Sequence, residues 1–280
     1  MGHAPGRGRA CAAPGWDGRH ATPAPAAPAP FLAHRTAFFS PKGGQGGTTI
    51  AVNVAVALRQ LTQQEVVIFD ADLQGGNAHM LLDLPCEHSM ADLVPHMDQG
   101  RLDSAALDQV LGRHASGVKV LMRPGRPADA DRVTAAHVER VLATLALLYD
   151  HVIVDCSGTY DDRLFAVLDR ADQIVLVLQP DIGAVTNVER FLDLADKLGY
   201  PRRKLRVVLN RANTRVGIEL QAIEARLAAP AYYRVDSVGA ALTRSVNLGQ
   251  PLVLSQPRSR YAQVIRDIAA DVRRGDEPSA

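Results

Sequence analysis

Residues 40–49 read Ser-Pro-Lys-Gly-Gly-Gln-Gly-Gly-Thr-Thr. They follow a short apolar run at residues 36–40 and precede residues 50–61, which are apolar on most faces. This order predicts a strand, a glycine-rich turn and a buried helix. Glycine lets a backbone approach an anion closely, and the free N–H groups at a helix N-terminus bind phosphate. The stretch therefore predicts a phosphate-binding loop at the end of a strand.

The loop departs from the common phosphate-binding pattern G-x-x-x-x-G-K-[ST] at two positions. Pro41 stands in place of the first glycine and Gly47 in place of the lysine, whereas Thr48 keeps the hydroxyl that would bind Mg²⁺. A lysine occurs instead near the start of the loop, at Lys42. A glycine-rich turn that binds no ligand is the alternative interpretation at this point.

Further apolar runs follow the loop along the chain. Each is continuously apolar rather than alternating, which is typical of parallel strands buried on both faces. Helical stretches separate them, as in repeated βαβ units. The predicted strands are residues 65–70, 118–122, 151–155, 173–178 and 205–210. We therefore expect one α/β domain at residues 35–274, with a doubly wound, mostly parallel sheet flanked by helices.

Polar residues stand at the ends of the predicted strands. Asp70, Asp155 and Asn210 each end a run, and the glycine-rich loop follows another. In such sheets the ligand lies beyond the carboxyl ends of the strands. Because Mg²⁺ prefers oxygen ligands, Thr48 would bind it directly, Asp155 through water, and Asp70 would support the same shell. The alternative for each acid is a cap on the strand end.

The first 34 residues differ in composition from the rest. Six of the 17 prolines lie in residues 1–30, among alanine, glycine and arginine. No helical or alternating apolar period occurs there, so we expect a disordered tail at residues 1–34. A cleaved transit peptide is the alternative. Residues 275–280 are expected to form a flexible C-terminus.

Composition excludes several classes of function. The chain has 31 lysine and arginine residues and 30 aspartate and glutamate residues, which gives a net charge of +1. Aromatic residues make up only 5% of the 280 residues. Nucleic-acid binding is therefore not expected, since it needs a basic surface or stacking aromatics. The three scattered cysteines form no disulfide framework, which favours a reducing, cytoplasmic compartment. The chain has no run of 18 apolar residues that could span a membrane.

Two further segments admit more than one interpretation. Residues 202–206 contain a small basic run, which we interpret as a solvated strand entry rather than a DNA contact. The last predicted helix has an apolar stripe at Tyr261, Val264, Ile265, Ile268 and Val272. Its polar face mixes both charges, so we expect core or dimer packing and at most peripheral membrane contact.

Four motifs together resemble the MinD/ParA family of ATPases with a deviant Walker A loop. Residues 41–49 resemble that loop, and residues 67–74 (Val-Ile-Phe-Asp-Ala-Asp-Leu-Gln) resemble the family's Asp-x-Asp-x-Gln switch segment. Residues 152–155 resemble its Walker B strand, and residues 207–211 its adenine-side strand end. The order and spacing match from about residue 36 to residue 268.

The resemblance implies ATP and Mg²⁺ as cofactors and a homodimer as the working form. It implies that Lys42 reaches phosphate across the dimer and that Asp72 orients the attacking water. Asn210 and Arg211 would line the base. The implied ATP-binding loop consists of Lys42, Gly43, Gly44, Gln45, Gly46, Gly47, Thr48 and Thr49.

Within the family the sequence is similar to the CpaE/TadZ branch of Flp (Tad) pilus assembly proteins. A small residue in place of the loop lysine, here Gly47, is typical of that branch, as are residues 70–77 and 245–252. This implies an ATP-binding localisation or scaffold factor for pilus or secretion machinery, found at a cell pole or the inner membrane face. Weak or no ATP hydrolysis is expected, so enzyme activity stays an open question. The alternative is an active ParA/MinD-type switch for chromosome partition or septum-site placement.

Overall fold

The computed structural model describes residue 1 and residues 32–214, 217–229 and 231–274. The expected tail lies mostly outside these residues, as does the C-terminus at residues 275–280. All helices and strands belong to the unit formed by residues 31–280. No helix of the described residues is long and apolar enough to cross a membrane.

One eight-stranded sheet forms the centre of this unit, in the order β3-β4-β2-β5-β1-β6-β7-β8. All neighbouring strands are parallel except β3 and β4, which pair antiparallel at one edge. The strands are β1 His34–Phe39, β2 Val66–Asp70, β3 Gly112–Arg113, β4 Lys119–Leu121, β5 His151–Asp155, β6 Gln173–Leu178, β7 Leu205–Asn210 and β8 Tyr233–Val235. The expected doubly wound α/β class is confirmed.

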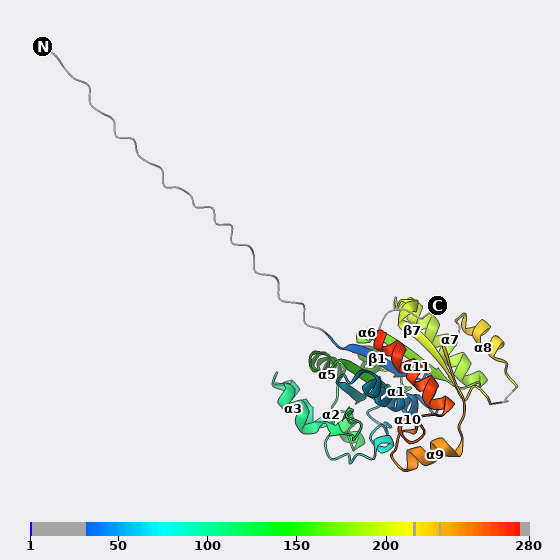
Figure 1. Ribbon diagram of the computed structural model, residues 1–280. Helices are drawn as coiled ribbons and strands as arrows, with labels where there is room; N and C mark the ends of the chain where they lie inside the picture. Colours follow the sequence, from blue (N-terminus) through cyan, green and yellow to red (C-terminus); the bar gives the residue numbers. More distant parts are fainter. Residues whose placement is uncertain (2–31, 215–216, 230, 275–280) are drawn as a thin grey trace. The chain divides into compact units, whose positions relative to one another are not determined.

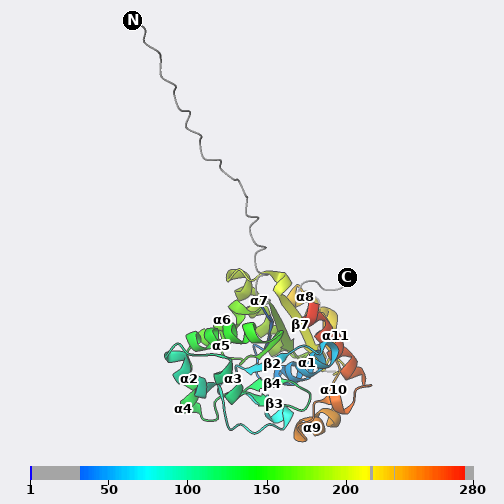
Figure 2. The ribbon, with the colours of Figure 1, turned by 60° about the vertical axis from the view of Figure 1, so that its left-hand side comes forward.

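Helices cover both faces of the sheet (Figures 1 and 2). One face carries α1 Gly47–Thr62, α10 Leu252–Ser255 and α11 Arg260–Arg274, with α9 Ala240–Asn247 beside them. The other carries α2 Met90–Asp98, α3 Ser104–Val110, α5 Ala135–Leu148, α6 Asp162–Arg170, α7 Ile182–Lys197 and α8 Leu220–Leu227. The short α4 Pro127–Ala130 and the 3₁₀ turns η1 Met80–Leu82 and η2 Arg202–Lys204 complete the elements.

Side chains of the central strands alternate between two apolar cores. Phe38 and Ile68 pack toward α1 and α11, whereas Phe39 and Phe69 pack toward the opposite helices. All four are at most 1% exposed. Because both faces are covered, the strands read as continuous apolar runs, which is why β5, β6 and β7 match their predicted bounds.

The packed domain begins slightly before the expected residue 35. Ala33 is buried, and its N–H donates to the carbonyl of Ala146 at 2.9 Å. Strand β1 starts at His34 rather than at residue 36. These two residues therefore belong to the fold, because their backbone groups find partners at the amino end of the sheet.

The apolar stripe of α11 packs into the core, as expected. Tyr261, Ile265, Ile268 and Val272 are each at most 2% exposed in the core that contains α1. The interpretation of residues 202–206 as a solvated strand entry is wrong at Arg206, which is 3% exposed. Its Nε lies 3.6 Å from a carboxylate oxygen of Asp271 on α11, so this pairing compensates the burial of its charge.

Candidate functional site

The glycine-rich loop connects β1 to α1 at the carboxyl edge of the sheet. Gly46 caps α1 with a φ of 91°, in the left-handed region that favours glycine. A Cβ placed on Gly46 would lie 2.4 Å from Nδ2 of Asn210, too close for any real contact. That Nδ2 donates to the carbonyl of Gln45 at 2.7 Å. The loop therefore requires glycine at position 46 for two separate reasons.

A second strand end holds the same loop. The buried Oε1 of Gln45 accepts a hydrogen bond of 2.7 Å from the backbone N–H of Gln179, just after β6. In return Nε2 of Gln179 donates to the carbonyl of Gly44 at 2.9 Å. The loop is thus attached to the ends of both β6 and β7. Gln179 was not among the residues predicted from the sequence, although a polar residue directly after an apolar run is a usable signal.

Substituting the loop glycines separates the cost of a left-handed backbone from the cost of the contact with Asn210. Gly46→Ala should lower the free energy of unfolding by about 2–4 kcal/mol, because a left-handed alanine and the collision with Asn210 both oppose it. Gly44→Ala should lose about 1–2 kcal/mol, since φ is 78° but the space for a Cβ is open. Urea unfolding followed by circular dichroism measures both. Gly43→Ala is the control, with no positive φ and no atom within 4 Å of the new Cβ. Equal losses at positions 44 and 46 would show that the contact with Asn210 has no energetic weight.

Two carboxylates lie side by side beyond the loop. Asp70 and Asp155 are register partners across β2 and β5, and they are 0% and 2% exposed. Oδ2 of Asp70 accepts from the N–H of Ala78 at 3.1 Å. Oδ1 of Asp70 and Oδ2 of Asp155 are buried with no hydrogen-bond partner among the described residues. Two unpaired, buried carboxylate oxygens at adjacent strand ends are suited to a cation.

The electrostatics of this pair agree with that geometry. Burial raises the pKa of Asp70 to about 7, and the nearby charge of Asp72 adds to the effect. Burial also raises the pKa of Asp155 well above its ordinary value, and the charge of Asp70 adds to it. The Thr48 side chain is hydrogen-bonded to Asp155 and acts in the opposite direction, lowering that pKa. A bound divalent cation would favour both carboxylates in their charged forms.

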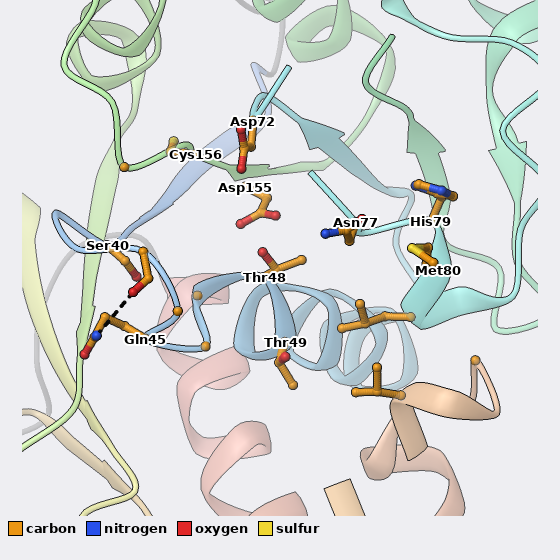
Figure 3. A pocket seen from close by; sticks show the side chains of 18 of the residues that line it. Ser40, Gln45, Thr48, Thr49, Asp72, Asn77, His79, Met80, Asp155 and Cys156 are labelled. Carbon is orange, nitrogen blue, oxygen red and sulfur yellow. Dashed lines mark hydrogen bonds between the residues drawn. The ribbon is translucent and has the colours of Figure 1, made fainter. Parts of the chain in front are cut away.

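The donor set fits Mg²⁺ rather than a transition metal. The described residues contain no group of three or more His, Cys, Asp and Glu side chains that could hold a metal. Mg²⁺ typically uses one or two carboxylates, with waters and substrate phosphates completing its shell. Thr48, Asp70 and Asp155 supply such a set of oxygens next to the loop. Figure 3 shows two of them, Thr48 and Asp155.

The segment after β2 brings Asp72 next to Thr48 and Asp155. Thr48, Asp72 and Asp155 face a common space in Figure 3. Oδ1 of Asp72 accepts from the N–H of Gly75 at 3.0 Å, which closes a tight turn. Gly76 passes so close that a Cβ on it would lie 2.0 Å from Oδ1 of Asp70. Gly76 is thus a further residue that the site requires, and it was not among the site residues predicted from the sequence.

Lys42 is paired within its own chain. Its Nζ lies 2.7 Å from Oδ1 of Asp181, with both side chains about 40% exposed. Asp181 is also the N-cap of α7 and accepts from the N–H of Ala184 at 2.9 Å. An exposed pair of this kind contributes only about 0–1 kcal/mol, so the lysine can leave it at small cost. Asp181 went unnoticed in the sequence because it lies 139 positions from its partner.

The predicted residues line two adjoining cavities. A larger one of about 1190 Å³ is lined by Gly43, Gly44, Gln45, Gly46, Gly47, Thr48, Thr49, Asp72, Asp155 and Arg211 among others. A smaller one of about 270 Å³ is lined by Asn210 and Arg211, with residues 236–239 opposite. Lys42 and Asp70 line neither cavity. Lys42 is paired with Asp181 instead, and Asp70 is fully buried, with Gly76 passing close to its carboxylate.

Known proteins resemble this chain in sequence and in fold. The chain is 26% identical over 86% of its length to an uncharacterized ATP-binding protein of Methanocaldococcus jannaschii, of which it covers 88%. The crystal structure of a ParA family ATPase from Chlorobium tepidum is similar, with a TM-score of 0.79, 27% identity, and coverage of 85% of this chain and 98% of that one. The septum site-determining protein MinD of Pyrococcus horikoshii, complexed with Mg-ADP, gives a TM-score of 0.74 at 21% identity, covering 86% and 96% of the two chains.

A family model shows the relationship directly. The model of the CobQ/CobB/MinD/ParA nucleotide binding domain matches residues 36–249, which include the glycine-rich loop, both buried acids and the end of β7. With the sheet order and the loop geometry described above, this match establishes that the chain belongs to the CobQ/CobB/MinD/ParA family.

Proposed function

We propose that the protein is an ATP-binding localisation or scaffold factor of the CpaE/TadZ type, which serves pilus (Flp/Tad) or secretion machinery and hydrolyses ATP slowly or not at all. The observation that carries the proposal is Gly47. The surrounding loop keeps its glycines, its N-terminal helix position and Thr48, yet the ammonium group that normally contacts the β- and γ-phosphates is missing. Such a site retains binding while its catalytic electrostatics are weakened.

In this proposal different residues bind different parts of the nucleotide and its Mg²⁺ ion. Backbone N–H groups of residues 43–49 and the N-terminus of α1 hold the phosphates. Thr48, Asp70 and Asp155 hold Mg²⁺, which neutralises phosphate charge. Asp72 orients the attacking water, a positioning role typical of phosphoryl transfer. Asn210 and Arg211 line the base. The fold of the MinD complexed with Mg-ADP supports this assignment.

Lys42 is proposed to act between two copies of the chain. Its ion pair with Asp181 is exposed and weak, so the ammonium is available to reach a phosphate bound by a partner subunit. Dimer formation would then accompany ATP binding. The dimer would be cytoplasmic and positioned at a cell pole or at the inner membrane face through partner proteins.

An active ParA/MinD-type switch for chromosome partition or septum-site placement is the second candidate. It is favoured by the retained Lys42, Asp72 and Asp155, and by the names of the two similar structures. The two functions differ in turnover. A switch must hydrolyse ATP to reset, whereas a scaffold needs only to bind it.

Titration calorimetry with Mg²⁺ and ATP tests the proposal. Wild type should bind ATP, and chelation of Mg²⁺ should abolish binding. Lys42→Ala should abolish ATP-dependent dimerisation, measured by light scattering, and weaken binding with it. Lys197→Ala, at the far end of α7, is the matched control and should behave as wild type. No binding by wild type, with binding restored in Gly47→Lys, would mean that the protein acts without nucleotide. Fast turnover by wild type would favour the switch.

A further inference from the structure

Arg123 joins two strand ends at the carboxyl edge of the sheet. Strand β4 pairs with β2 in parallel, so its end lies at the same edge as Asp70. The half-buried Arg123 follows this end. Its Nε donates to the carbonyl of Gly76, and its Nη1 donates to the carbonyl of Pro124 at 2.6 Å. Arg123 therefore attaches the segment after β2 to the end of β4.

The segment that Arg123 holds encloses the Asp70 carboxylate. A Cβ on Gly76 would lie 2.0 Å from Oδ1 of Asp70, and the N–H of Ala78 donates to Oδ2 at 3.1 Å. The N–H of Gly76 donates to the carbonyl of Asp72 at 2.8 Å. Gly76 thus packs against the Asp70 carboxylate and also accepts from Arg123. A displacement of the Gly76 carbonyl would therefore displace the groups that fix the carboxylate.

The positive charge of Arg123 is not needed for these hydrogen bonds. Both of its acceptors are backbone carbonyls, which a neutral donor could also reach. Burial raises the pKa of Asp70, and the charge of Arg123 acts in the opposite direction. The charge thus indicates a role toward the buried acid in addition to holding Gly76.

Arg123 lies behind the site rather than in it. It lines neither the larger nor the smaller cavity, so it would act on a bound cation through the segment that it holds. Groups that orient the ligands of a metal ion, without binding the ion themselves, typically change metal affinity about 10- to 100-fold when they are replaced.

We propose that Arg123 is a positioning residue of the Mg²⁺ site: by holding the Gly76 carbonyl, it keeps the Asp70 carboxylate in the orientation that binds the cation. The proposal rests on the nucleotide binding proposed above. It adds a residue outside the four motifs of the sequence, since those motifs lie at the ends of β1, β2, β5 and β7, whereas Arg123 follows β4.

Arg123→Gln tests the proposal through the Mg²⁺ dependence of ATP binding. The full chain is titrated with ATP by calorimetry at a series of free Mg²⁺ concentrations. The Mg²⁺ concentration that gives half of the maximal association constant should rise about 10- to 100-fold in the variant. Saturating Mg²⁺ should restore the wild-type ATP affinity, because Arg123 lines neither cavity. Arg123→Lys keeps the charge and a donor, so it should recover most of the wild-type Mg²⁺ dependence.

Hydrogen exchange of the ligand-free protein tests the contact with Gly76 directly. In Arg123→Gln the amides of Gly76 and Ala78 should exchange about tenfold faster or more, since one charge-assisted hydrogen bond that holds the segment is lost. The amides of β5 should exchange as in wild type. Unchanged exchange at Gly76 and Ala78 would refute the proposed path, because Arg123 would then not hold the segment.

Arg126→Gln is the matched control. Arg126 is exposed, lines neither cavity and forms no side-chain hydrogen bond among the described residues. This variant should keep the wild-type Mg²⁺ dependence and exchange rates. An unchanged Mg²⁺ dependence in Arg123→Gln would overturn the role of Arg123 and leave the proposed function intact. A loss of ATP affinity that saturating Mg²⁺ does not restore would contradict the role as well, since it would reflect a general loss of structure. A wild type that binds no ATP at any Mg²⁺ concentration would overturn both.

Discussion

Gly47→Lys should raise the rate of ATP hydrolysis about 10- to 150-fold. A lysine at this position would add one charge-assisted hydrogen bond to the phosphates, worth about 1.5–3 kcal/mol. The new Cβ would lie 2.9 Å from Oγ of Ser40. That hydroxyl is buried without a partner among the described residues, so it can rotate away without losing a hydrogen bond. Release of inorganic phosphate at saturating ATP and Mg²⁺ measures the effect.

Gly47→Ala separates the charge from the steric contact. It brings the same Cβ next to Ser40 but no ammonium, so its turnover should stay at the wild-type level. If Gly47→Lys changes turnover less than twofold while wild type already hydrolyses ATP rapidly, another group performs the lysine's role. That result would contradict the scaffold proposal and favour the ParA/MinD-type switch.

Asp70→Asn should stabilise the ligand-free protein at pH 8 by about 2–4 kcal/mol. Asp70 has a folded-state pKa of about 7 against an ordinary value of 3.8. The neutral Asp70 carboxyl group therefore contributes its full stabilisation of the fold below pH 3.8. This stabilisation is lost as the pH rises through 7, because the buried carboxyl group ionises. Asparagine never ionises, and its amide oxygen can still accept from the N–H of Ala78. Urea unfolding should show that the gain in free energy of unfolding from Asp70→Asn is about 2–3 kcal/mol larger at pH 8 than at pH 5.

Asp131→Asn is the control for this series, because Asp131 is exposed. It should be neutral at both pH values. Mg²⁺ and ATP should reverse the order of stability, since only wild type offers the Asp70 carboxylate to the cation. A ligand-free Asp70→Asn that is less stable than wild type at pH 8 would refute the interpretation of the two buried acids as an unfavourable pair.

The parts that the sequence predicted are those with strong local signals. Strands β5, β6 and β7 are runs of branched apolar residues closed by polar ones, and their ends carry Asp155 and Asn210. Parallel pairing then brings those ends together, which is why the acids and the loop could be assigned to one edge. The two-residue β3 and three-residue β8 were missed, because each contains an arginine and neither forms a continuous apolar run.

The remaining site residues depend on contacts between distant segments. Gln179 and Asp181 act on a loop about 135 positions earlier, and no local pattern marks such a pairing. Arg123 follows the predicted strand at residues 118–122, but its partner Gly76 lies 47 positions earlier. That contact arises only when β4 and β2 pair in the sheet.

The attachment of the loop to two strand ends has a consequence for the entropy of binding. Gln179 and Asn210 already fix the carbonyls of Gly44 and Gln45 before any ligand arrives. A loop ordered in advance loses little conformational freedom when a phosphate binds, so more of the interaction free energy appears as affinity. Rigidity of the backbone thus compensates in part for the missing lysine, and a chain without that ammonium group can still hold a nucleotide.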